Sequence, residues 1–259
     1  MKISIYIIDA FAKKQFTGNP AAVCPLKKWL PDSVMQSIAL ENNLSETAFF
    51  VPTSNGYHIR WFTPAKEVDL CGHATLASAY VIFNHLSHNF KEIVFESKSG
   101  QLRATQNNEW IELDFPTLIP LACETPDEFI EAFGLKPKEC FSAMDYMLVF
   151  DDEEYIKRVN PNLSLLKDIS GRGVIITAIS KKYDFVNRFF TPKYGIGEDP
   201  VTGSAFTQLM PYWSSRLNKK KLFAKQVSKR SGEVKCEIMG DRVKISGTAV
   251  EYSIGRINI

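Results

Sequence analysis

One sequence pattern occurs twice in this chain, once in each half. Residues 60–64 read RWFTP and are followed by CGHA at 71–74, while residues 188–192 read RFFTP and are followed by TGSA at 202–205. The two copies lie about half of the 259-residue chain apart. A two-copy repeat predicts a duplicated domain, in which each half contributes one glycine turn to a cleft between the copies.

The repeat continues downstream of both motifs. Residues 99–102 read SGQL, and residues 231–234 read SGEV. Each opens an alternating run, which is followed by a turn at 107–108 or 240–241 and then by a second strand-like segment. Each half is therefore predicted to contain a β-hairpin at the same place.

The segment after the first glycine turn predicts a buried helix. Residues 73–84 are small or apolar on nearly every face, which predicts a helix with a sheet wrapped around it. In the second half a helix is expected from Ser204 onward, and Pro211 should kink it or cut it short. The expected domains are residues 1–118 and 119–259, with the last strand free to pack back on the first half.

Composition excludes several classes of protein. The chain is 45% apolar and 23% charged with a formal net charge of +2, which is ordinary for a globular protein and gives no argument for nucleic-acid or membrane partners. No apolar window is long enough for a membrane span, and no signal peptide is recognisable. Five cysteines without a CxxC pair indicate free thiols in a cytoplasmic protein.

Both glycine turns have the properties of an anion site. Gly72 and Gly203 each precede a predicted helix, whose unpaired N–H groups and macrodipole attract anions. Two such termini meeting across a cleft would hold a small carboxylate. The alternative interpretation is that both glycines only form helix-entry turns.

Several titratable groups lie near these turns. Cys71 and His73 flank Gly72, and Asp199 shortly precedes the second turn. Glu46 stands at the start of an apolar strand, where desolvation would raise its pKa toward the range that a general acid or base needs. The alternative is that Glu46 is only a turn residue at the mouth of the strand.

No metal site is predicted. His85 and His88 could share a helix face, but no third ligand is evident near them. Cys71 and His73 are not expected to point into one site if a helix starts at His73. A Walker-type phosphate loop and a nucleophile-elbow motif are both absent.

Four motifs in order resemble the phenazine biosynthesis-like (PhzF-like) family. They are GNP at 18–20, LSETAF at 44–49, CGHAT at 71–75 and EDPVTGSA at 198–205. The resemblance implies the diaminopimelate epimerase superfold, which belongs to the α+β class. It has two pseudo-symmetric halves, each a mixed β-sheet rolled around a central helix, with the active site between them.

The resemblance also implies an activity and a set of site residues. Family members of known activity isomerise a small carboxylic acid by proton transfer, without cofactor or metal. Glu46 is then the acid/base, with His73 and Asp199 assisting. The positions implied to bind substrate are Gly72, Gly203, Ser204, Asn19, Ser45 and Cys71. The resemblance further implies a homodimer.

One departure from related enzymes bears on the mechanism. The epimerase and proline racemase relatives use a cysteine before each glycine turn, whereas this chain has Cys71 before the first and Thr202 before the second. A threonine hydroxyl is too weak an acid to replace a thiol, so racemisation by two thiols is not expected. The leading hypothesis is an isomerase. The alternatives are an epimerase or lyase using Cys71 with Glu46, and a non-catalytic protein that binds small molecules.

Overall fold

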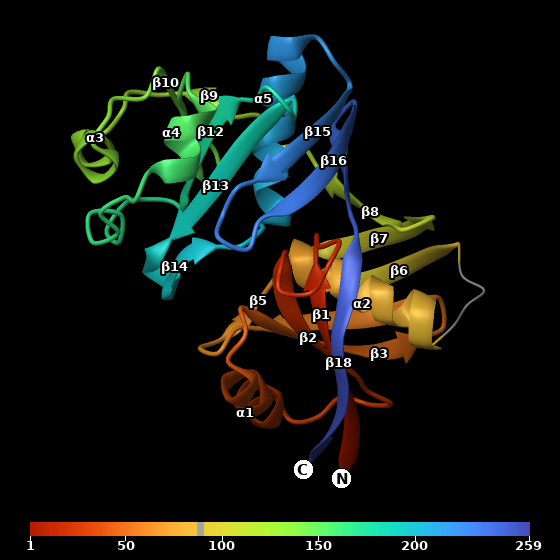
Figure 1. The fold of residues 1–259 in the computed structure, drawn as a ribbon. Helices are drawn as coiled ribbons and strands as arrows, with labels where there is room; N and C mark the ends of the chain where they lie inside the picture. Colours follow the sequence, from red (N-terminus) through yellow and green to blue (C-terminus); the bar gives the residue numbers. More distant parts are fainter. Residues whose placement is uncertain (87–90) are drawn as a thin grey trace. The chain divides into compact units, whose positions relative to one another are not determined.

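The computed structural model describes residues 1–86 and 91–259, and the chain divides into two compact units. Unit 1 contains residues 1–114 and 246–259, and unit 2 contains residues 115–245. The last strand, β18 (Ala249–Asn258), therefore belongs to unit 1. It pairs antiparallel with β1 (Lys2–Ala10), which brings the two chain ends side by side (Figure 1).

Unit 1 is a mixed sheet in which a helix lies between the two strands of each parallel pair. Its strands after β1 are β2 (Asn19–Pro25), β3 (Glu46–Thr53), β4 (Gly56–Phe62), β5 (Glu67–Val68), β6 (Glu92–Ser97), β7 (Gly100–Asn107) and β8 (Trp110–Pro116). Strands β1 and β2 are antiparallel, whereas β2 and β3 are parallel because α1 (Asp32–Asn42) connects them. Strand β4 then pairs antiparallel with β3 and β5 but parallel with β6, and β6 to β8 follow antiparallel.

Unit 2 repeats this order of strand directions. Its strands are β9 (Leu121–Ala122), β10 (Glu139–Ser142), β11 (Tyr146–Val149), β12 (Val174–Ile179), β13 (Phe185–Thr191), β14 (Ile196–Asp199), β15 (Lys221–Gln226), β16 (Gly232–Met239) and β17 (Arg242–Gly247). Strands β10 and β11 are antiparallel, and β11 and β12 are parallel across α4 (Glu153–Arg158). Strand β13 pairs antiparallel with β12 and β14 but parallel with β15. The predicted α+β duplication is thus confirmed strand by strand.

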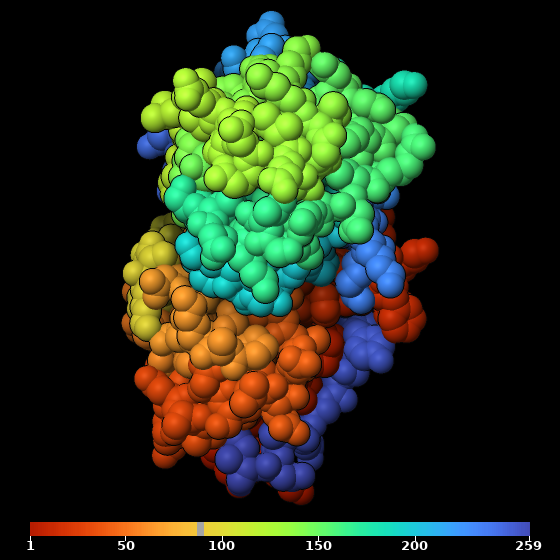
Figure 2. Space-filling model, turned by 90° about the vertical axis from the view of Figure 1, so that its left-hand side faces the viewer, coloured from red at the N-terminus to blue at the C-terminus, as the bar shows by residue number. Residues whose placement is uncertain are grey.

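The outer surface of unit 2 is formed in part by the middle of the chain. The remaining helix of this unit, α3 (Asp127–Phe133), buries Phe129, Ala132 and Phe133 against the apolar core under β11 to β13. Figure 2 shows one face of this unit, where the green and cyan segments from α3 to β14 form the surface.

The buried helix predicted at 73–84 is confirmed as α2 (Gly72–Val81). Nine of its ten residues are buried, and it packs against β1, β2 and β3. Its threonine and serine hydroxyls bond back to the preceding turn, because Thr75 Oγ1 donates to the Cys71 carbonyl and Ser78 Oγ to the Ala74 carbonyl. The small side chains let the strands approach closely, which explains how a helix can be covered on nearly every face.

Of the two effects expected of Pro211, a kink or an early end of the second helix, the early end is not found. After a 3-10 turn, η3 (Gly203–Ala205), helix α5 runs through Pro211 from Phe206 to Leu217. A proline inside a helix leaves the carbonyl four residues earlier without its usual donor. That carbonyl belongs to Thr207, and it accepts a 3.0 Å hydrogen bond from the Leu118 N–H instead.

No helix among the described residues is long and apolar enough to cross a membrane.

Candidate functional site

Glu46 and His73 are brought together in unit 1 by the strand and the helix that carry them. Glu46 is the first residue of β3, and His73 is the second residue of α2. The His73 Nε2 atom lies 3.2 Å from the Glu46 Oε2 atom, with 6% and 15% of the side chains exposed. The angle of approach does not meet hydrogen-bond geometry, so the contact is electrostatic in character.

Two further predicted residues contact the other nitrogen of the same ring. Asn19 Nδ2 lies 3.3 Å from His73 Nδ1, and Cys71 Sγ lies 3.5 Å from it. An amide NH₂ group can only donate, so Nδ1 is an acceptor and the proton of the neutral ring lies on Nε2. The N–H of the neutral ring therefore lies on the side of His73 that faces Glu46, although it does not have the geometry of a hydrogen bond.

Burial keeps the His73 ring neutral. Desolvation lowers the pKa of His73 from its ordinary value of 6.5 to about 3, because a charged imidazolium loses its hydration in the core. A negative charge on the nearby Glu46 carboxylate would raise the pKa of His73. With 5% of the residue exposed, burial dominates, and His73 is neutral near pH 7.

The expectation that Cys71 and His73 could not point into one site is wrong. One ligand atom from each of Glu46, Cys71 and His73 lies within 4.8 Å of the others. Cys71 has an extended backbone immediately before α2, and this turns its thiol back toward the helix. Three ligands form a minimal metal set, although both His73 nitrogens already face protein groups. His85 contacts Glu251 at 2.8 Å, and His88 lies outside the described residues.

Asp199 and Thr202 form a contact of their own in unit 2. The Thr202 Oγ1 atom donates a 2.5 Å hydrogen bond to Asp199 Oδ2. Buried Gln226 fixes the turn between them, because its Nε2 donates to the Asp199 carbonyl and its Oε1 accepts from the Thr202 N–H. The Asp199 carboxylate is thus bonded to the Thr202 hydroxyl, and Gln226 fixes the backbone of both residues.

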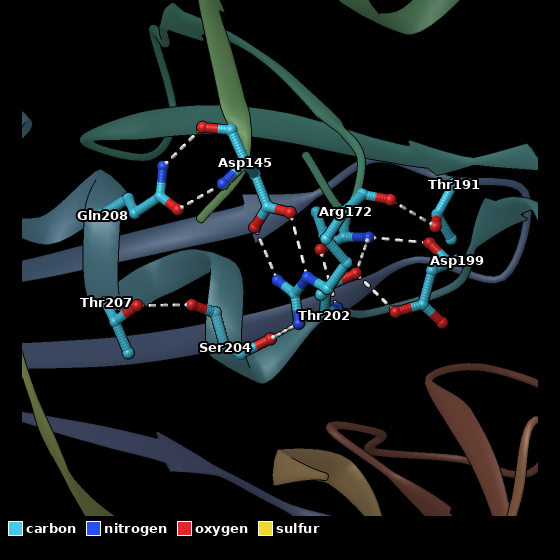
Figure 3. A network of polar contacts seen from close by, with 9 residues as sticks. Asp145, Arg172, Thr191, Asp199, Thr202, Ser204, Thr207 and Gln208 are labelled. Carbon is cyan, nitrogen blue, oxygen red and sulfur yellow. Dashed lines mark hydrogen bonds and ion pairs between the residues drawn. The ribbon is translucent and has the colours of Figure 1, made fainter. Parts of the chain in front are cut away.

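Ser204 belongs to a polar network in the same unit, shown in Figure 3. Arg172 donates from Nη1 to Ser204 Oγ at 2.7 Å. The same guanidinium donates from Nε and Nη2 to the two oxygens of Asp145, whose side chain is fully buried. Neither Arg172 nor Asp145 was predicted from the sequence.

Strand register shows which positions of the two units correspond. Strand β5 pairs Val68 with Trp61, and β14 pairs Asp199 with Phe189 at the equivalent place. Counting forward from these pairs, Thr202 occupies the position of Cys71 and Ser204 that of His73. The predicted replacement of the second thiol by a hydroxyl therefore falls at truly equivalent positions.

The arginines of the repeated motif have a structural role in each unit. Arg60 forms two parallel hydrogen bonds to Glu67, at 2.7 and 2.9 Å. Arg188 forms the same pair with Glu198, at 2.6 and 2.9 Å. The Arg60 guanidinium lowers the pKa of Glu67 to about 2. These pairs tie β4 to β5 and β13 to β14, next to the two glycine turns.

The predicted site residues thus fall into two groups, one in each unit. In unit 1 the structure brings together Glu46, His73, Asn19 and Cys71, with Gly72 at the start of α2 and half-buried Ser45 just before β3. In unit 2 it places Asp199 at the end of β14, and Gly203 and Ser204 in η3. A surface hollow of about 370 Å³ in unit 2, lined by Lys157, Tyr183 and Lys225 among others, contains none of these residues.

The fold defines the broader class of the protein. The structure is similar to a hydroxyproline epimerase from Agrobacterium vitis with a TM-score of 0.66 at 10% identity, over 99% of this chain and 92% of the other. At that identity the likeness concerns the fold alone, and it supports the diaminopimelate epimerase-like architecture.

The family follows from the sequence and from a much closer structure. Residues 8–255 match the family described as phenazine biosynthesis-like protein (PhzC-PhzF). An uncharacterized isomerase of Pseudomonas aeruginosa is 47% identical over 100% of both chains. A crystal structure of an Enterococcus faecalis protein of the PhzF family is 48% identical, covers 100% of both chains and has a TM-score of 0.98. The chain belongs to the phenazine biosynthesis-like family.

Proposed function

We propose that the protein is a cofactor-independent isomerase that moves a proton on a small carboxylic acid. The observation that carries the proposal is the buried contact between Glu46 and neutral His73. The naming of a full-length relative with 47% identity as an isomerase supports the reaction class. The substrate is defined by its chemistry, as a small molecule with a carboxylate, a carbon–carbon double bond and an acidic C–H bond next to that double bond.

In this mechanism Glu46 is the general base and then the general acid. Its carboxylate takes a proton from one substrate carbon, exchanges that proton with water through its partly exposed side chain, and delivers a proton to a different carbon, so that a double bond moves and the formula of the acid is unchanged. His73 supports both steps with its Nε2–H on the side of the ring that faces Glu46, while Asn19 holds the ring in that tautomer. A positioned acid–base group contributes about 10²–10⁴-fold to the rate.

Unit 2 is proposed to supply a further carboxylate and an anion-binding turn. Asp199, held by Thr202, assists proton transfer. Within each unit, the backbone N–H groups at the start of a helical turn (Gly72 in unit 1, Gly203 and Ser204 in unit 2) are proposed to bind a carboxylate, because the dipoles of these turns favour an anion. Ser45, which precedes Glu46, is proposed to contact the same substrate.

Cys71 provides the second candidate function. Its thiol lies in the same cluster as Glu46, which is the arrangement that an epimerase or lyase with one thiol and one carboxylate would use. The hydroxyl of Thr202 at the equivalent position cannot act as the second thiol, so we favour Cys71 as a substrate contact.

Exchange of solvent deuterium tests the class of function. Wild-type protein is incubated in D₂O with a panel of small unsaturated and hydroxylated carboxylic acids, and their masses are followed. The proposal predicts incorporation of one deuterium into an isomerised acid, and Cys71→Ser should retain this exchange. Loss of exchange in a folded Cys71→Ser protein would favour the epimerase or lyase, and binding without any exchange would favour a non-catalytic protein.

We also propose a homodimer, because closed two-fold assemblies are the commonest oligomers of soluble proteins. Sedimentation at micromolar concentration should give a species of twice the 29.3 kDa chain mass. A species of chain mass alone would contradict this.

A further inference from the structure

The hydroxyl of Ser204 is hydrogen-bonded to the side chain of Arg172, which can donate hydrogen bonds but cannot accept them. The Arg172 guanidinium carries N–H groups only, and Nη1 lies 2.7 Å from Ser204 Oγ. The serine oxygen is therefore the acceptor in this bond, and its own proton must point away from Arg172. The adjacent cation also polarises the hydroxyl, which makes it a stronger donor to a negatively charged group.

Arg172 is itself fixed from several sides. Its guanidinium makes a two-bond fork with Asp145 and lies 5.2 Å from the centre of the Phe189 ring. Its carbonyl accepts from Thr191 Oγ1 at 2.9 Å. Asp145 is anchored in turn, because both its backbone N–H and its carbonyl are bonded to the Gln208 side chain. The orientation of the guanidinium is thus set before any ligand arrives.

The residue that follows Arg172 permits this close approach. A β-carbon on Gly173 would meet Phe189 Cζ and the Phe190 carbonyl oxygen, both at 2.6 Å. Glycine lets the loop lie directly against β13, which brings Arg172 within reach of η3. The close packing of Gly173 on β13 therefore explains why a glycine follows the arginine.

Comparison of the two duplicated units shows that unit 1 has no arginine at the position of Arg172. Val174 pairs with Phe190 as Thr47 pairs with Phe62, so Arg172 occupies the position that Ser45 has in unit 1. At these equivalent positions unit 1 has Ser45 and His73, whereas unit 2 has Arg172 and Ser204; the nearby carboxylate of unit 2, Asp199, is bonded to Thr202. The guanidinium and hydroxyl of the unit 2 pair suit the binding of an anion rather than the movement of a proton.

We propose that Arg172 is a positioning residue, which orients Ser204 Oγ to donate a hydrogen bond to the carboxylate of the ligand. The inference rests on the proposed function in one respect, namely that the ligand is a carboxylate. Arg172 acts through Ser204, and Asp145 and Gln208 hold Arg172 in place. The competing explanation is that Arg172 only ties the 171–173 loop to the fold.

A double-mutant cycle with an NMR readout separates these explanations. Acetate, lactate and benzoate are titrated into ¹⁵N-labelled protein, with their amides as uncharged controls, and the backbone amide shift of Ser204 is followed. We expect saturable shifts from the carboxylates and none from the amides. Arg172→Lys should weaken carboxylate binding about tenfold, which is the scale of one charge-assisted hydrogen bond. The matched control Arg216→Lys, which alters an exposed pair with Glu139, should bind like wild type.

The cycle is completed by Ser204→Ala. In that background Arg172→Lys should change affinity less than about twofold, because residues acting through one contact are not additive. Equal weakening in both backgrounds, or wild-type affinity in Arg172→Lys, would overturn the proposal. Arg172→Met, which keeps the stem over Phe189, replaces the lysine variant if that variant does not fold. Failure of both to fold would assign Arg172 to the fold alone and would also overturn the proposal.

The outcomes distinguish this inference from the proposed function. Deuterium exchange by the wild type together with unchanged carboxylate binding in Arg172→Lys would overturn the role of Arg172 only. Carboxylate binding that depends on Arg172 without any exchange would support this inference and contradict the isomerase. A wild-type protein that binds none of the three carboxylates at Ser204 would overturn the inference, while the exchange experiment would still decide the function.

Discussion

The Nε2 atom of His73 lies 3.2 Å from the Oε2 atom of Glu46, in a part of unit 1 where both side chains are largely buried. Glu46 opens β3, and His73 follows the glycine that begins α2. A parallel pair of strands, β2 and β3, brings Asn19 and Glu46 to the same edge of the sheet, beside the start of the helix. The contact therefore depends on the order of the strands, and any change that shifts β3 would separate the pair.

Buried His73 should make the protein less stable in acid. Burial lowers its pKa from 6.5 to about 3, so between these values the unfolded chain binds a proton that the folded chain does not. The free energy of unfolding is therefore unaffected by the titration of His73 above pH 6.5, and it decreases as the pH falls from 6.5 toward 3. Relative to His73→Gln, the wild type should lose about 1 kcal/mol of unfolding free energy per pH unit between pH 6 and 4.

Urea unfolding of both proteins at several pH values measures this difference. Parallel pH profiles would show that His73 does not titrate differently in the folded state. A wild type that gains stability on acidification relative to His73→Gln would show that attraction to Glu46 outweighs burial.

A β-carbon at Gly203 should weaken carboxylate binding more than it weakens the fold. Gly203 opens the η3 turn and has no positive φ, so the alanine backbone is compatible with the turn. The added methyl group would obstruct an anion that approaches the N–H groups directly. In Gly203→Ala we expect a melting temperature within a few degrees of wild type and carboxylate affinity about tenfold lower. Unchanged affinity with a lowered melting temperature would mean that the glycine serves the fold only.

The five thiols should differ sharply in reactivity. Cys123 is exposed, whereas burial raises the pKa of both Cys24 and Cys236 well above the usual range. Only the thiolate reacts quickly with iodoacetamide. Peptide mass analysis after brief alkylation of the native protein should find Cys123 modified and the two buried thiols intact. Modification of Cys24 or Cys236 on the same timescale would indicate that the core opens far more readily than the structure indicates.

The parts of the fold that follow from local sequence were predictable. The buried helix α2 is recognisable because its residues are small or apolar on every side, and the duplication is recognisable because RWFTP and RFFTP differ at one position. The pairs of Arg60 with Glu67 and Arg188 with Glu198 were missed because the partners are 7 and 10 residues apart. The sequence did contain a signal for these pairs, since Glu67 and Glu198 each stand five residues before the glycine of their repeat, Gly72 or Gly203.

Other contacts depend on tertiary structure and leave no local pattern. Asp145 and Arg172 are 27 residues apart, and neither has a charged counterpart in the first half, so no repeat draws attention to them. Where α5 passes through Pro211, the freed Thr207 carbonyl finds its donor in Leu118, which lies far away in sequence. The convergence of Cys71 and His73 on one cluster depends on the extended backbone of a single residue. Each of these is set by a distant contact or by one dihedral angle, which residue types alone do not specify.

The central claim is that Glu46 carries the proton, and deuterium exchange in a Glu46→Gln protein tests it most directly. The substitution keeps the size of the side chain and removes the base. With any acid that the wild type labels in D₂O, the account predicts a fall in the exchange rate of at least about 100-fold, with a melting temperature and carboxylate affinity close to wild type. Exchange at the wild-type rate in a folded Glu46→Gln protein would contradict the account.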